Sequence, residues 1–319
     1  MNILVTGGCG FIGSNFIKHM LDTYDYKITN IDKLTYAGRR ENLEGYDIHP
    51  NYYFVKGDIN ESELLEHLIE SRNIDTIINF AAESHVDNSI KNSDEFIHTN
   101  IIGTHTLLKM LHKFPIKKFI QISTDEVYGT LGEYENAFTE DTPLAPNSPY
   151  AASKTAADLL CRSFHETYGY PITITRCSNN YGSNQYPEKL IPLMIKNAKS
   201  GKKLPVYGDG RNIRDWIHVQ DHCEAIDIVL HKGKDGEVYN IGGLDEKRNI
   251  DIIESIIDEA GGSRYDLIEY VKDRPGHDFR YAIDHSKITK ELGWKPKISF
   301  KDGIKKTIDF YKEKFRETN

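Results

Sequence analysis

The segment Ile3-Leu4-Val5-Thr6-Gly7-Gly8-Cys9-Gly10-Phe11-Ile12-Gly13 decides how the chain begins its fold. A short apolar run leads into spaced glycines, and a helical pattern follows at once. In this strand–turn–helix context Gly7 permits a tight turn, Gly10 lets the backbone approach a pyrophosphate, and Gly13 allows the helix to pack close to the strand. The start of the helix then offers N–H groups and the positive end of its dipole to phosphates. The segment therefore predicts a dinucleotide-binding turn.

Asp32 stands 19 residues after Gly13, at the end of the second apolar run. An acidic residue at this place accepts hydrogen bonds from the adenosine ribose and repels a 2′-phosphate, so it favours NAD over NADP. The alternative is a solvated aspartate at the end of a strand. Asp58 and Ile59, which follow the third apolar run, are expected to border the adenine.

Short apolar runs alternate with helical patterns through the first half of the chain. One helical stripe runs from Ile12 to Leu21, and another runs from Leu64 to Ile69. This alternation predicts an α/β fold, a Rossmann-type doubly wound parallel sheet with helices on both faces. The runs are nearly continuous in apolar residues, as buried parallel strands are. They are Ile3–Val5, Ile28–Ile31, Tyr53–Val55, Thr76–Phe80, Phe119–Ile122 and Ile172–Thr175.

The second half of the chain is less regular and carries more proline, glycine and tyrosine. We expect residues 1–180 to form the dinucleotide-binding domain and residues 181–319 to form a smaller α/β domain that binds the substrate. A segment at about 216–240 is expected to return to the main sheet. Helices are expected at Ile250–Ala260 and Asp302–Phe315.

Composition narrows the class of protein. Among 319 residues the formal net charge is −8, and lysine and arginine form no basic block, so no nucleic-acid or anionic-membrane partner is expected. No apolar run approaches the ~20 residues of a membrane helix, and the N-terminus lacks a signal-peptide pattern. Cys9, Cys161, Cys177 and Cys223 form no CxxC pair, which argues against zinc and disulfides. We therefore expect a cytoplasmic enzyme that holds no metal.

Tyr150 and Lys154 begin a helical pattern just after Pro149. Their spacing of four places them on one face of the helix. The phenol of a free tyrosine has a pKa of about 10, and a neighbouring ammonium brings that value towards neutral pH. Such a tyrosine can take a hydroxyl proton while hydride leaves the same carbon. The alternative is an ordinary pair on the surface of a helix.

The segment Ser123-Thr-Asp-Glu-Val-Tyr-Gly129 follows the fifth apolar run. Ligands bind at the carboxyl ends of the strands in open parallel sheets, so these side chains are expected at the rim of the active site. Two adjacent carboxyl groups can divide acid and base roles if their surroundings separate their pKa values. The alternative is a loop of solvated acids before the next helix.

Together these motifs resemble the extended short-chain dehydrogenase/reductase family, and within it the branch that dehydrates nucleotide sugars. The resemblance covers essentially the whole chain. The triplet Thr124-Asp125-Glu126 is its sharpest part, because related nucleotide-sugar epimerases usually lack it. The other matching pieces are TGGxGFIG at 6–13, Ala81–Asp87, Asn100-x-x-Gly103, the Tyr150/Lys154 pair, Arg176–Gly182, Pro187–Pro192, Ile213–Trp216, Tyr239–Gly243 and Asp273–His277.

The resemblance implies an NAD-dependent lyase that converts dTDP-glucose into a 4-keto-6-deoxy sugar, in deoxysugar biosynthesis of the rhamnose type. Tyr150 would take the C4 hydroxyl proton while the C4 hydride passes to NAD, with Thr124 bonded to that oxygen and Lys154 holding the nicotinamide ribose and tuning Tyr150. Glu126 would then remove the C5 proton, and Asp125 would protonate the departing C6 hydroxyl. The hydride would return to C6, so NAD would stay bound and no external reductant would be consumed.

The resemblance also assigns contact residues, and residues 181–319 become the nucleotide-sugar-binding domain. The cofactor positions are Gly7, Gly10, Phe11, Ile12, Gly13, Asp32, Lys33, Leu34, Thr35, Asp58, Ile59, Ala81, Ala82, Thr99, Tyr150, Lys154 and Asn180. The substrate positions are Ser84, Thr124, Asn179, Lys189, Leu190, Pro205, Val206, Tyr207, Arg214, Asn240, Arg274 and His277. Arginine suits phosphate because its planar fork binds two oxygens at once. The alternative for Arg214 and Arg274 is a salt bridge to Asp215 or Asp273, and for His277 a loop histidine with a local partner.

Other functions stay open at this point. A UDP-sugar 4-epimerase or decarboxylase would share the fold, but simple epimerisation needs no acid at C6. A 4,6-dehydratase for another nucleotide sugar is a second alternative, because thymine rests on the resemblance alone. A non-enzymatic NAD-binding protein is a third. A homodimer through helices of the first domain is the family expectation.

Two short stretches depart from the family pattern. Asn88 follows Asp87 where an arginine is common, for which we expect a small change in a local salt bridge. Arg39-Arg40 replaces a small polar pair, and the sequence offers no account of that change.

Overall fold

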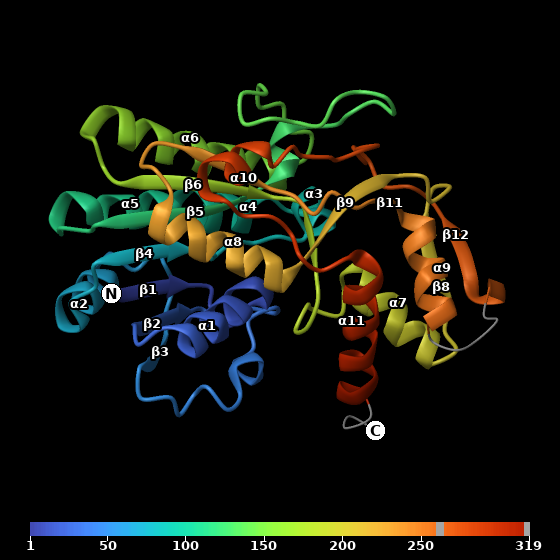
Figure 1. The fold of residues 1–319 in the computed structure, drawn as a ribbon, viewed down its shortest axis with the longest axis horizontal. Helices are drawn as coiled ribbons and strands as arrows, with labels where there is room; N and C mark the ends of the chain where they lie inside the picture. Colours follow the sequence, from blue (N-terminus) through green and yellow to red (C-terminus); the bar gives the residue numbers. More distant parts are fainter. Residues whose placement is uncertain (260–264, 316–319) are drawn as a thin grey trace.

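The main sheet of the protein contains seven parallel strands. In the computed structural model, which describes residues 1–259 and 265–315, the strand order is β10-β6-β5-β4-β1-β2-β3 (Figure 1). The chain winds outward from β1 in both directions, which leaves a crevice at the carboxyl ends of the central strands. The strands are β1 (Asn2–Thr6), β2 (Lys27–Asp32), β3 (Tyr52–Lys56), β4 (Thr76–Asn79), β5 (Lys118–Thr124), β6 (Ile172–Cys177) and β10 (Val238–Ile241).

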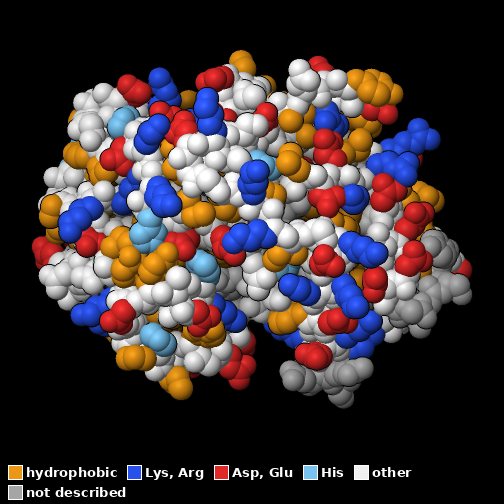
Figure 2. Space-filling model, viewed as in Figure 1, with side chains coloured by type: hydrophobic (Ala, Val, Ile, Leu, Met, Phe, Trp, Pro, Cys, Tyr) orange, Lys and Arg blue, Asp and Glu red, His pale blue; other side chains and the backbone are white. Residues whose placement is uncertain are grey.

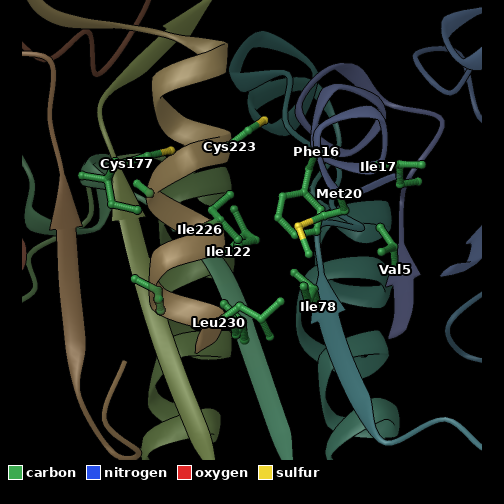
Figure 3. Close-up of a cluster of buried hydrophobic side chains, with 14 of the residues drawn as sticks. Val5, Phe16, Ile17, Met20, Ile78, Ile122, Cys177, Cys223, Ile226 and Leu230 are labelled. Atoms are coloured by element: carbon green, nitrogen blue, oxygen red, sulfur yellow. The ribbon is translucent and has the colours of Figure 1, made fainter. Parts of the chain in front are cut away.

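Helices cover both faces of this sheet. The layer on one face consists of α1 (Phe11–Thr23), α8 (Val219–Lys232) and α10 (Ser286–Leu292). The layer on the other face consists of α2 (Ser62–Arg72), α5 (Thr104–Lys113) and α6 (Pro149–Tyr168). Figure 3 shows the first layer, where Phe16 and Met20 of α1 approach Ile226 and Leu230 of α8 above the strands. The predicted Rossmann-type sheet, covered on both faces, is confirmed.

The predicted strands match the structure closely, because each apolar run supplies side chains to a core on both faces of the sheet. Five of the six runs lie inside strands that extend by one or two residues at their ends. The fourth run differs, since β4 ends at Asn79 and leaves Phe80 beyond the strand. All seven side chains of β5 are buried, as expected near the middle of a covered sheet.

The second half of the chain contributes to both parts of the molecule. The segment at about 216–240, which was expected to return to the main sheet, does so in part. Strand β10 joins the main sheet and α8 packs on it, while Trp216 lies in a smaller three-stranded sheet. The smaller sheets are built from β7 (Asn179–Tyr181), β8 (Leu204–Tyr207), β9 (Ile213–His218), β11 (Glu246–Arg248) and β12 (Ile268–Val271). The domain boundary near residue 180 stays a prediction.

Three helices share an apolar core with these smaller sheets. They are α7 (Leu190–Lys199), α9 (Asn249–Glu259) and α11 (Phe300–Lys314). The last two confirm the predicted helices, although α11 begins at Phe300 and Ala260 lies outside the described residues. Within the described ranges, every helix is too short or too polar to span a bilayer.

Several short helical turns connect the main elements. They are η1 (Arg40–Leu43), α3 (Val86–Lys91), α4 (Asp94–Phe96), η2 (Ile97–Gly103), η3 (Asp125–Tyr128) and η4 (Tyr265–Leu267). The turn η2 is a π-helix, and it carries Asn100 inward. The Asn100 amide donates to the Ser153 hydroxyl at 2.8 Å and accepts from the Glu83 N–H at 2.9 Å. Asn100 therefore ties the segment after β4 to the helix that carries Tyr150.

Candidate active site

A cavity of about 320 Å³ opens at the carboxyl ends of the central strands. The turn after β1, the ends of β2 and β5, the segment after β4 and the first turns of α6 border it. The segment after β6, residues 177–189, closes the remaining side. This is the crevice at which doubly wound sheets bind their ligands.

The glycine-rich turn keeps its shape through backbone contacts that a side chain would prevent. Gly7 has a φ of +66°, and a Cβ atom there would lie 2.8 Å from the backbone of Ala81. A Cβ atom on Gly13 would lie 2.6 Å from the carbonyl oxygen of Gly7. The helix α1 starts after Gly10 with no side-chain cap, so its first N–H groups are available to an anion. The cradle fits the pyrophosphate of a dinucleotide.

Asp32 is fixed by the turn that it faces. Its Oδ2 atom accepts a hydrogen bond from the N–H of Cys9 at 2.8 Å, and its Oδ1 atom accepts one from the N–H of Leu34 at 2.8 Å. Burial raises the pKa of this carboxyl, and the two backbone bonds oppose the rise. A carboxylate has about four lone-pair positions, so two remain for ribose hydroxyls.

All but one of the predicted cofactor residues line the cavity. The exception is Leu34, whose side chain packs against the core while its backbone supports Asp32. Lys33 and Asp58 form an ion pair of 2.9 Å at the edge of the cavity. The lining residues are Gly7, Gly10, Phe11, Ile12, Gly13, Asp32, Lys33, Thr35, Asp58, Ile59, Ala81, Ala82, Thr99, Tyr150, Lys154 and Asn180.

Thr124 and Asp125 meet where β5 ends. The Oγ1 atom of Thr124 accepts a hydrogen bond from the N–H of Glu126 at 3.3 Å and so starts the turn η3. Asp125 is 2% exposed, and its Oδ2 atom has no hydrogen-bond partner among the described residues. Burial raises the pKa of Asp125 well above its ordinary value, and the charges of Glu126 and Asp215 add to the rise. Asp125 therefore favours its neutral form, with a proton to donate.

Glu126 lies in a different electrostatic environment from its neighbour. Burial raises its pKa too, but the positive charges of Arg274, Arg214 and Lys189 oppose that rise. These cations stabilise the carboxylate form of Glu126, whereas two acidic groups favour the neutral form of Asp125. The pKa of both carboxyls is raised, but that of Asp125 is raised well above its ordinary value, whereas the cations around Glu126 oppose its rise.

The helix α6 presents Tyr150 and Lys154 to the same cavity. Ser148 caps this helix by accepting a hydrogen bond from the N–H of Ala151 at 3.1 Å, and Pro149 forms its first turn. The Nζ atom of Lys154 donates to the carbonyl oxygen of Ile122 at 2.7 Å. Burial lowers the pKa of Lys154, and the charge of Asp158 opposes the change.

The expected lowering of the Tyr150 pKa by Lys154 is not what this cavity shows. Burial raises the pKa of Tyr150 well above its ordinary value, and the charges of Glu126 and Cys177 add to the rise. A side-chain hydrogen bond with Thr124 opposes it. Since Glu126 is the largest charged cause, protonation of Glu126 favours the phenolate. The proton affinities of Tyr150 and Glu126 are therefore linked.

A buried polar network supports this helix from behind. The Nε atom of Arg176 lies 2.9 Å from Oδ2 of Asp158, and its Nη1 atom donates to the Tyr128 hydroxyl at 2.9 Å. The Tyr128 hydroxyl donates in turn to Asn240 at 2.8 Å. Asn240 is fully buried, and its amide nitrogen donates to the carbonyl of Phe138 at 3.1 Å. The Asn240 side chain therefore supports the site from outside the cavity lining, and the substrate contact expected of it stays a prediction.

Four predicted substrate residues line the cavity, namely Ser84, Thr124, Asn179 and Lys189. The Nζ atom of Lys189 donates to the carbonyl oxygen of Ser84 at 2.9 Å. The cavity does not include Leu190 and Val206, whose side chains belong to the apolar core around α7. Pro205 precedes Val206 in β8, also outside the cavity lining. The side chain of Val206 is 1% exposed, and the substrate contacts expected of these three residues stay predictions.

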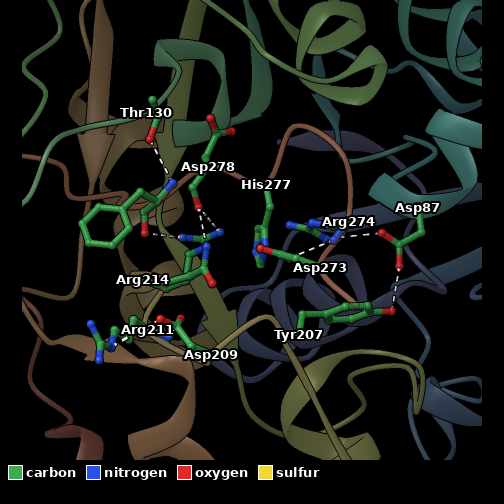
Figure 4. A network of polar contacts seen from close by, with 12 residues as sticks. Asp87, Thr130, Tyr207, Asp209, Arg211, Arg214, Asp273, Arg274, His277 and Asp278 are labelled. Carbon is green, nitrogen blue, oxygen red and sulfur yellow. Dashed lines mark hydrogen bonds and ion pairs between the residues drawn. The ribbon is translucent and has the colours of Figure 1, made fainter. Parts of the chain in front are cut away.

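Arg274, Tyr207 and His277 form a polar network around Asp87 and Asp273 (Figure 4). The Nη1 atom of Arg274 lies 3.5 Å from Oδ1 of Asp87, and the Tyr207 hydroxyl donates to Oδ2 of the same residue at 3.5 Å. The Nδ1 atom of His277 lies 2.6 Å from Oδ1 of Asp273. Arg274 therefore has Asp87 as its ion-pair partner, in place of the Asp273 that the sequence suggested. His277 has the local partner considered for it.

Arg214 does not form the salt bridge to Asp215 that was the alternative to a substrate contact. Its guanidinium donates to the carbonyl oxygens of Ile213 at 2.7 Å and Asp278 at 3.0 Å, and it lies over the ring of Tyr281 (Figure 4 shows the Asp278 contact). Asp215 is occupied by the N–H groups of Gly243 and Asp245. The suggested pair between Arg214 and Asp215 is therefore absent from the described contacts. The charge of Arg214 instead acts on Glu126.

Some cavity residues were missed by sequence reasoning. Ser123 and Glu83 lie inside the motifs Ser123–Gly129 and Ala81–Asp87, so adjacency to predicted residues was the available signal. Gln185, Tyr186 and Glu188 flank Lys189, and only the path of the chain after β6 shows that they reach the cavity. Among the described residues, no cluster of three or more His, Cys, Asp and Glu side chains is placed to hold a metal ion. Asn88 lies exposed in α3, and its effect on a salt bridge stays a prediction.

Known proteins resemble this chain over nearly its full length. The low-salt glycan biosynthesis protein Agl12 of Haloferax volcanii is 54% identical over 98% of this chain and 98% of its own. The structure of dTDP-glucose 4,6-dehydratase from Bacillus anthracis in complex with NAD is 55% identical, has a TM-score of 0.92, and covers 99% of this chain and 98% of its own. The dTDP-glucose 4,6-dehydratase of Streptomyces venezuelae, with NAD and dTDP bound, is 46% identical, has a TM-score of 0.95, and covers 98% and 97%.

The family model described as GDP-mannose 4,6 dehydratase matches residues 4–307, which include the glycine turn, the Thr124-Asp125-Glu126 triplet and the Arg274 network. The chain therefore belongs to the GDP-mannose 4,6-dehydratase family of NAD-dependent nucleotide-sugar enzymes, and its relatives named above include dTDP-glucose 4,6-dehydratases.

Proposed function

We propose that this chain dehydrates dTDP-glucose to the 4-keto-6-deoxy sugar nucleotide, using NAD that stays bound through each turnover. The observation that carries the proposal is the meeting of Asp125, Glu126 and Tyr150 in one cavity with the glycine turn. The reaction moves three protons, and the cavity holds three groups to handle them. Similarity to dTDP-glucose 4,6-dehydratases of 46% and 55% identity supports the choice of nucleotide.

NAD, when bound on the glycine turn, supplies the hydride acceptor for C4 of the sugar and the hydride donor for C6. Tyr150 takes the proton of the C4 hydroxyl, with Thr124 beside it and Lys154 supplying positive charge one helical turn away. Once C4 is a ketone, the proton on C5 is acidic and Glu126 removes it. Asp125 gives its proton to the C6 hydroxyl, which departs as water. The proton held by Glu126 returns to C5 when C6 is reduced, and the proton taken by Tyr150 balances the one lost by Asp125.

The electrostatics of the cavity support this division of roles. Asp125 is kept neutral by burial and by its acidic neighbours, which suits a proton donor. Glu126 lies among three cations that favour its charged form, which suits a base. The charge of Glu126 is the largest charged cause of the raised Tyr150 pKa, so it helps Tyr150 to keep the C4 proton that it has taken.

The alternatives differ in what this carboxyl pair would do. A UDP-sugar 4-epimerase expels no group from C6 of its substrate, so a proton donor at Asp125 would serve no step. A 4,6-dehydratase for another nucleotide sugar would use every one of these groups, and only the nucleoside contacts would differ. A non-enzymatic NAD-binding protein would leave the separated acid and base unexplained.

One assay distinguishes these functions. The purified protein is incubated separately with dTDP-glucose, UDP-glucose and GDP-mannose, and the alkali-developed absorbance of a 4-keto sugar is measured. We expect that product from dTDP-glucose. Epimerised UDP-sugar without a keto product, or a keto product formed fastest from UDP-glucose or GDP-mannose, would sink the proposal for dTDP-glucose.

The Glu126→Gln variant tests the mechanism within the same assay. We expect it to lose exchange of the C5 proton with solvent by a factor on the order of 10²–10⁴, the usual contribution of a placed base. Bound NAD should still be reduced when the substrate is added, because Tyr150 is intact. Full dehydration activity in this variant would show that the base is assigned wrongly.

We also propose a cytoplasmic homodimer that serves deoxysugar biosynthesis. The support for the dimer is a set of exposed apolar side chains on the neighbouring elements η2 and α6. Ile97 and Ile102 are each 45% exposed, and Leu159 is 52% exposed. Exposed apolar side chains that gather on one face are typical of a protein–protein contact, and sedimentation analysis measures the assembly directly.

A further inference from the structure

A second hollow, of about 640 Å³, lies beside the main cavity. It is bordered by the loop after β2, by residues 184–187, and by the last turns of α7 and α11. Ala37, Gln185 and Tyr186 line both spaces, so the loop after β2 and residues 185–186 separate them. Figure 2 shows a group of Lys and Arg side chains around α11, next to a notch between the two lobes of the molecule.

The walls of this second hollow carry positive charge from three separate segments. Arg39 comes from the loop after β2, Lys196 and Lys199 come from α7, and Lys314 comes from α11. Within the described residues, the lining contains no aspartate or glutamate. The charge of Lys314 also helps burial to lower the pKa of nearby Lys18. A local excess of cations in a chain of net charge −8 marks a place suited to an anion.

Helix ends explain some of this charge but not all of it. Lys196 and Lys199 lie in the last turn of α7, and Lys314 lies in the last turn of α11, where the negative end of the helix dipole stabilises cations. Arg39 has no such role, because it comes from a loop. Its guanidinium lies 4.6 Å from the centre of the Tyr186 ring, and its charge opposes the rise in the Tyr311 pKa that burial causes.

Aromatic rings lie next to these cations. Tyr186, Tyr311 and Phe315 all line the hollow. The rings of Tyr311 and Phe315 are stacked, with centres 5.5 Å apart and planes inclined by 29°. Arginine planes and aromatic rings are the surfaces on which proteins stack nucleobases, and lysines and arginines bind the attached phosphates.

We propose that this hollow is a second nucleotide-binding site, which takes a nucleoside polyphosphate. Arg39, Lys196 and Lys199 bind the phosphates, and Tyr186 and Phe315 hold the base, because Tyr311 is 1% exposed and is stacked on Phe315. The site also gives a reason for the arginine at position 39, which departs from the family pattern. The proposal does not depend on which sugar nucleotide reacts in the main cavity.

The test is a calorimetric titration of the NAD-loaded protein with ATP at low salt, after the main cavity has been saturated with dTDP. We expect one ATP to bind per chain, with an affinity that falls as salt is added. Arg39→Ala and the double variant Lys196→Ala/Lys199→Ala should each weaken binding by roughly tenfold, since each removes charge-assisted hydrogen bonds. Lys305→Ala is the matched control, because Lys305 is exposed on α11 outside the lining.

Inorganic tripolyphosphate separates the two parts of the proposed site. We expect it to compete with ATP but to bind more weakly, because it has no ring to stack. Absence of ATP binding, or equal ATP affinity in the wild type, Arg39→Ala and the double variant, would overturn the proposal. Equal affinities for tripolyphosphate and ATP would overturn the assignment of a nucleotide, and circular dichroism of each variant verifies that it is folded.

Discussion

The catalytic part of the main cavity and the polar network around Asp87, which lies outside the cavity lining, are built in different ways. On the catalytic side Thr124, Asp125, Tyr150 and Lys154 are each no more than 8% exposed, and all four belong to or adjoin β5 and α6. On the other side Tyr207 is 41% exposed, and Arg274 reaches Asp87 across 3.5 Å from a loop far away in the sequence. Burial changes the proton affinities of side chains strongly and needs rigid support. A surface that binds a ligand instead needs long side chains that extend to the ligand. The difference supports the proposed roles, which are chemistry for the first side and recognition for the second.

The largest effect is expected from the catalytic side. Tyr150→Phe removes the phenol that takes the C4 proton and should lower kcat by about 10²–10⁴-fold. Substrate binding should change little, because the ring stays in place. Steady-state kinetics with dTDP-glucose measures both quantities, and Tyr134→Phe at a 92% exposed position is the control. If Tyr150→Phe kept the wild-type kcat, the catalytic role proposed for this side of the site would be contradicted.

An intermediate effect is expected from the recognition side. Arg274→Ala removes a cation from the Asp87 network and should raise KM roughly tenfold, the cost of one charge-assisted contact, while kcat changes much less. Arg248→Ala is a matched control, because Arg248 pairs with Asp251 on the surface. A fall in kcat with unchanged KM would place Arg274 on the catalytic side instead, through its charge on Glu126.

The smallest effect concerns the pH dependence of stability. The folded pKa of Asp125 lies above its ordinary value of 3.8, so over the range between them the unfolded chain releases a proton that the folded chain keeps. The free energy of unfolding therefore falls as pH rises through that range. Asp125→Asn should make the slope of the unfolding free energy against pH less negative on the alkaline side of pH 3.8, as measured by urea unfolding.

Asp251→Asn is the control for this slope. Its folded pKa is lowered by Arg248, so its contribution to stability is present above the unfolded pKa and is lost only as pH falls towards the folded value. On the alkaline side of pH 3.8, the slope of the unfolding free energy against pH should therefore stay as in the wild type. An unchanged slope in Asp125→Asn would contradict the neutral state assigned to that carboxyl.

Much of the catalytic side could be predicted because its signals are local. Helical spacing placed Tyr150 and Lys154 on one face, and the position of Thr124 at the end of an apolar run placed the carboxyl pair at the crevice. The electrostatic detail could not be predicted in this way. Sequence reasoning expected Lys154 to lower the Tyr150 pKa, but burial and Glu126 raise it, because desolvation depends on everything packed around the phenol.

The recognition side was less predictable because its contacts join distant segments. From the sequence, Asp215 and Asp273 were the expected ion-pair partners of Arg214 and Arg274. In the folded chain Arg214 donates to backbone carbonyls, and Arg274 pairs with Asp87. Asn240 lies inside the Tyr239–Gly243 motif and Val206 was among the expected substrate contacts, yet both side chains are buried outside the cavity lining. A motif identifies a segment of chain, but the path of that segment decides which of its side chains reach the ligand.

The sequence by itself determined the parallel sheet, the glycine turn, the preference for NAD that Asp32 indicates, and the position of the triplet Thr124-Asp125-Glu126. These features could be predicted because strand and helix periodicities and turn glycines act over a few residues. Only the tertiary structure decided which carboxyl of the triplet stays protonated, which aspartate pairs with Arg274, and how Arg39 meets Lys196 and Lys199 around a second hollow. These outcomes depend on burial and on charges brought together from distant parts of the chain, and neither is present until the chain has folded.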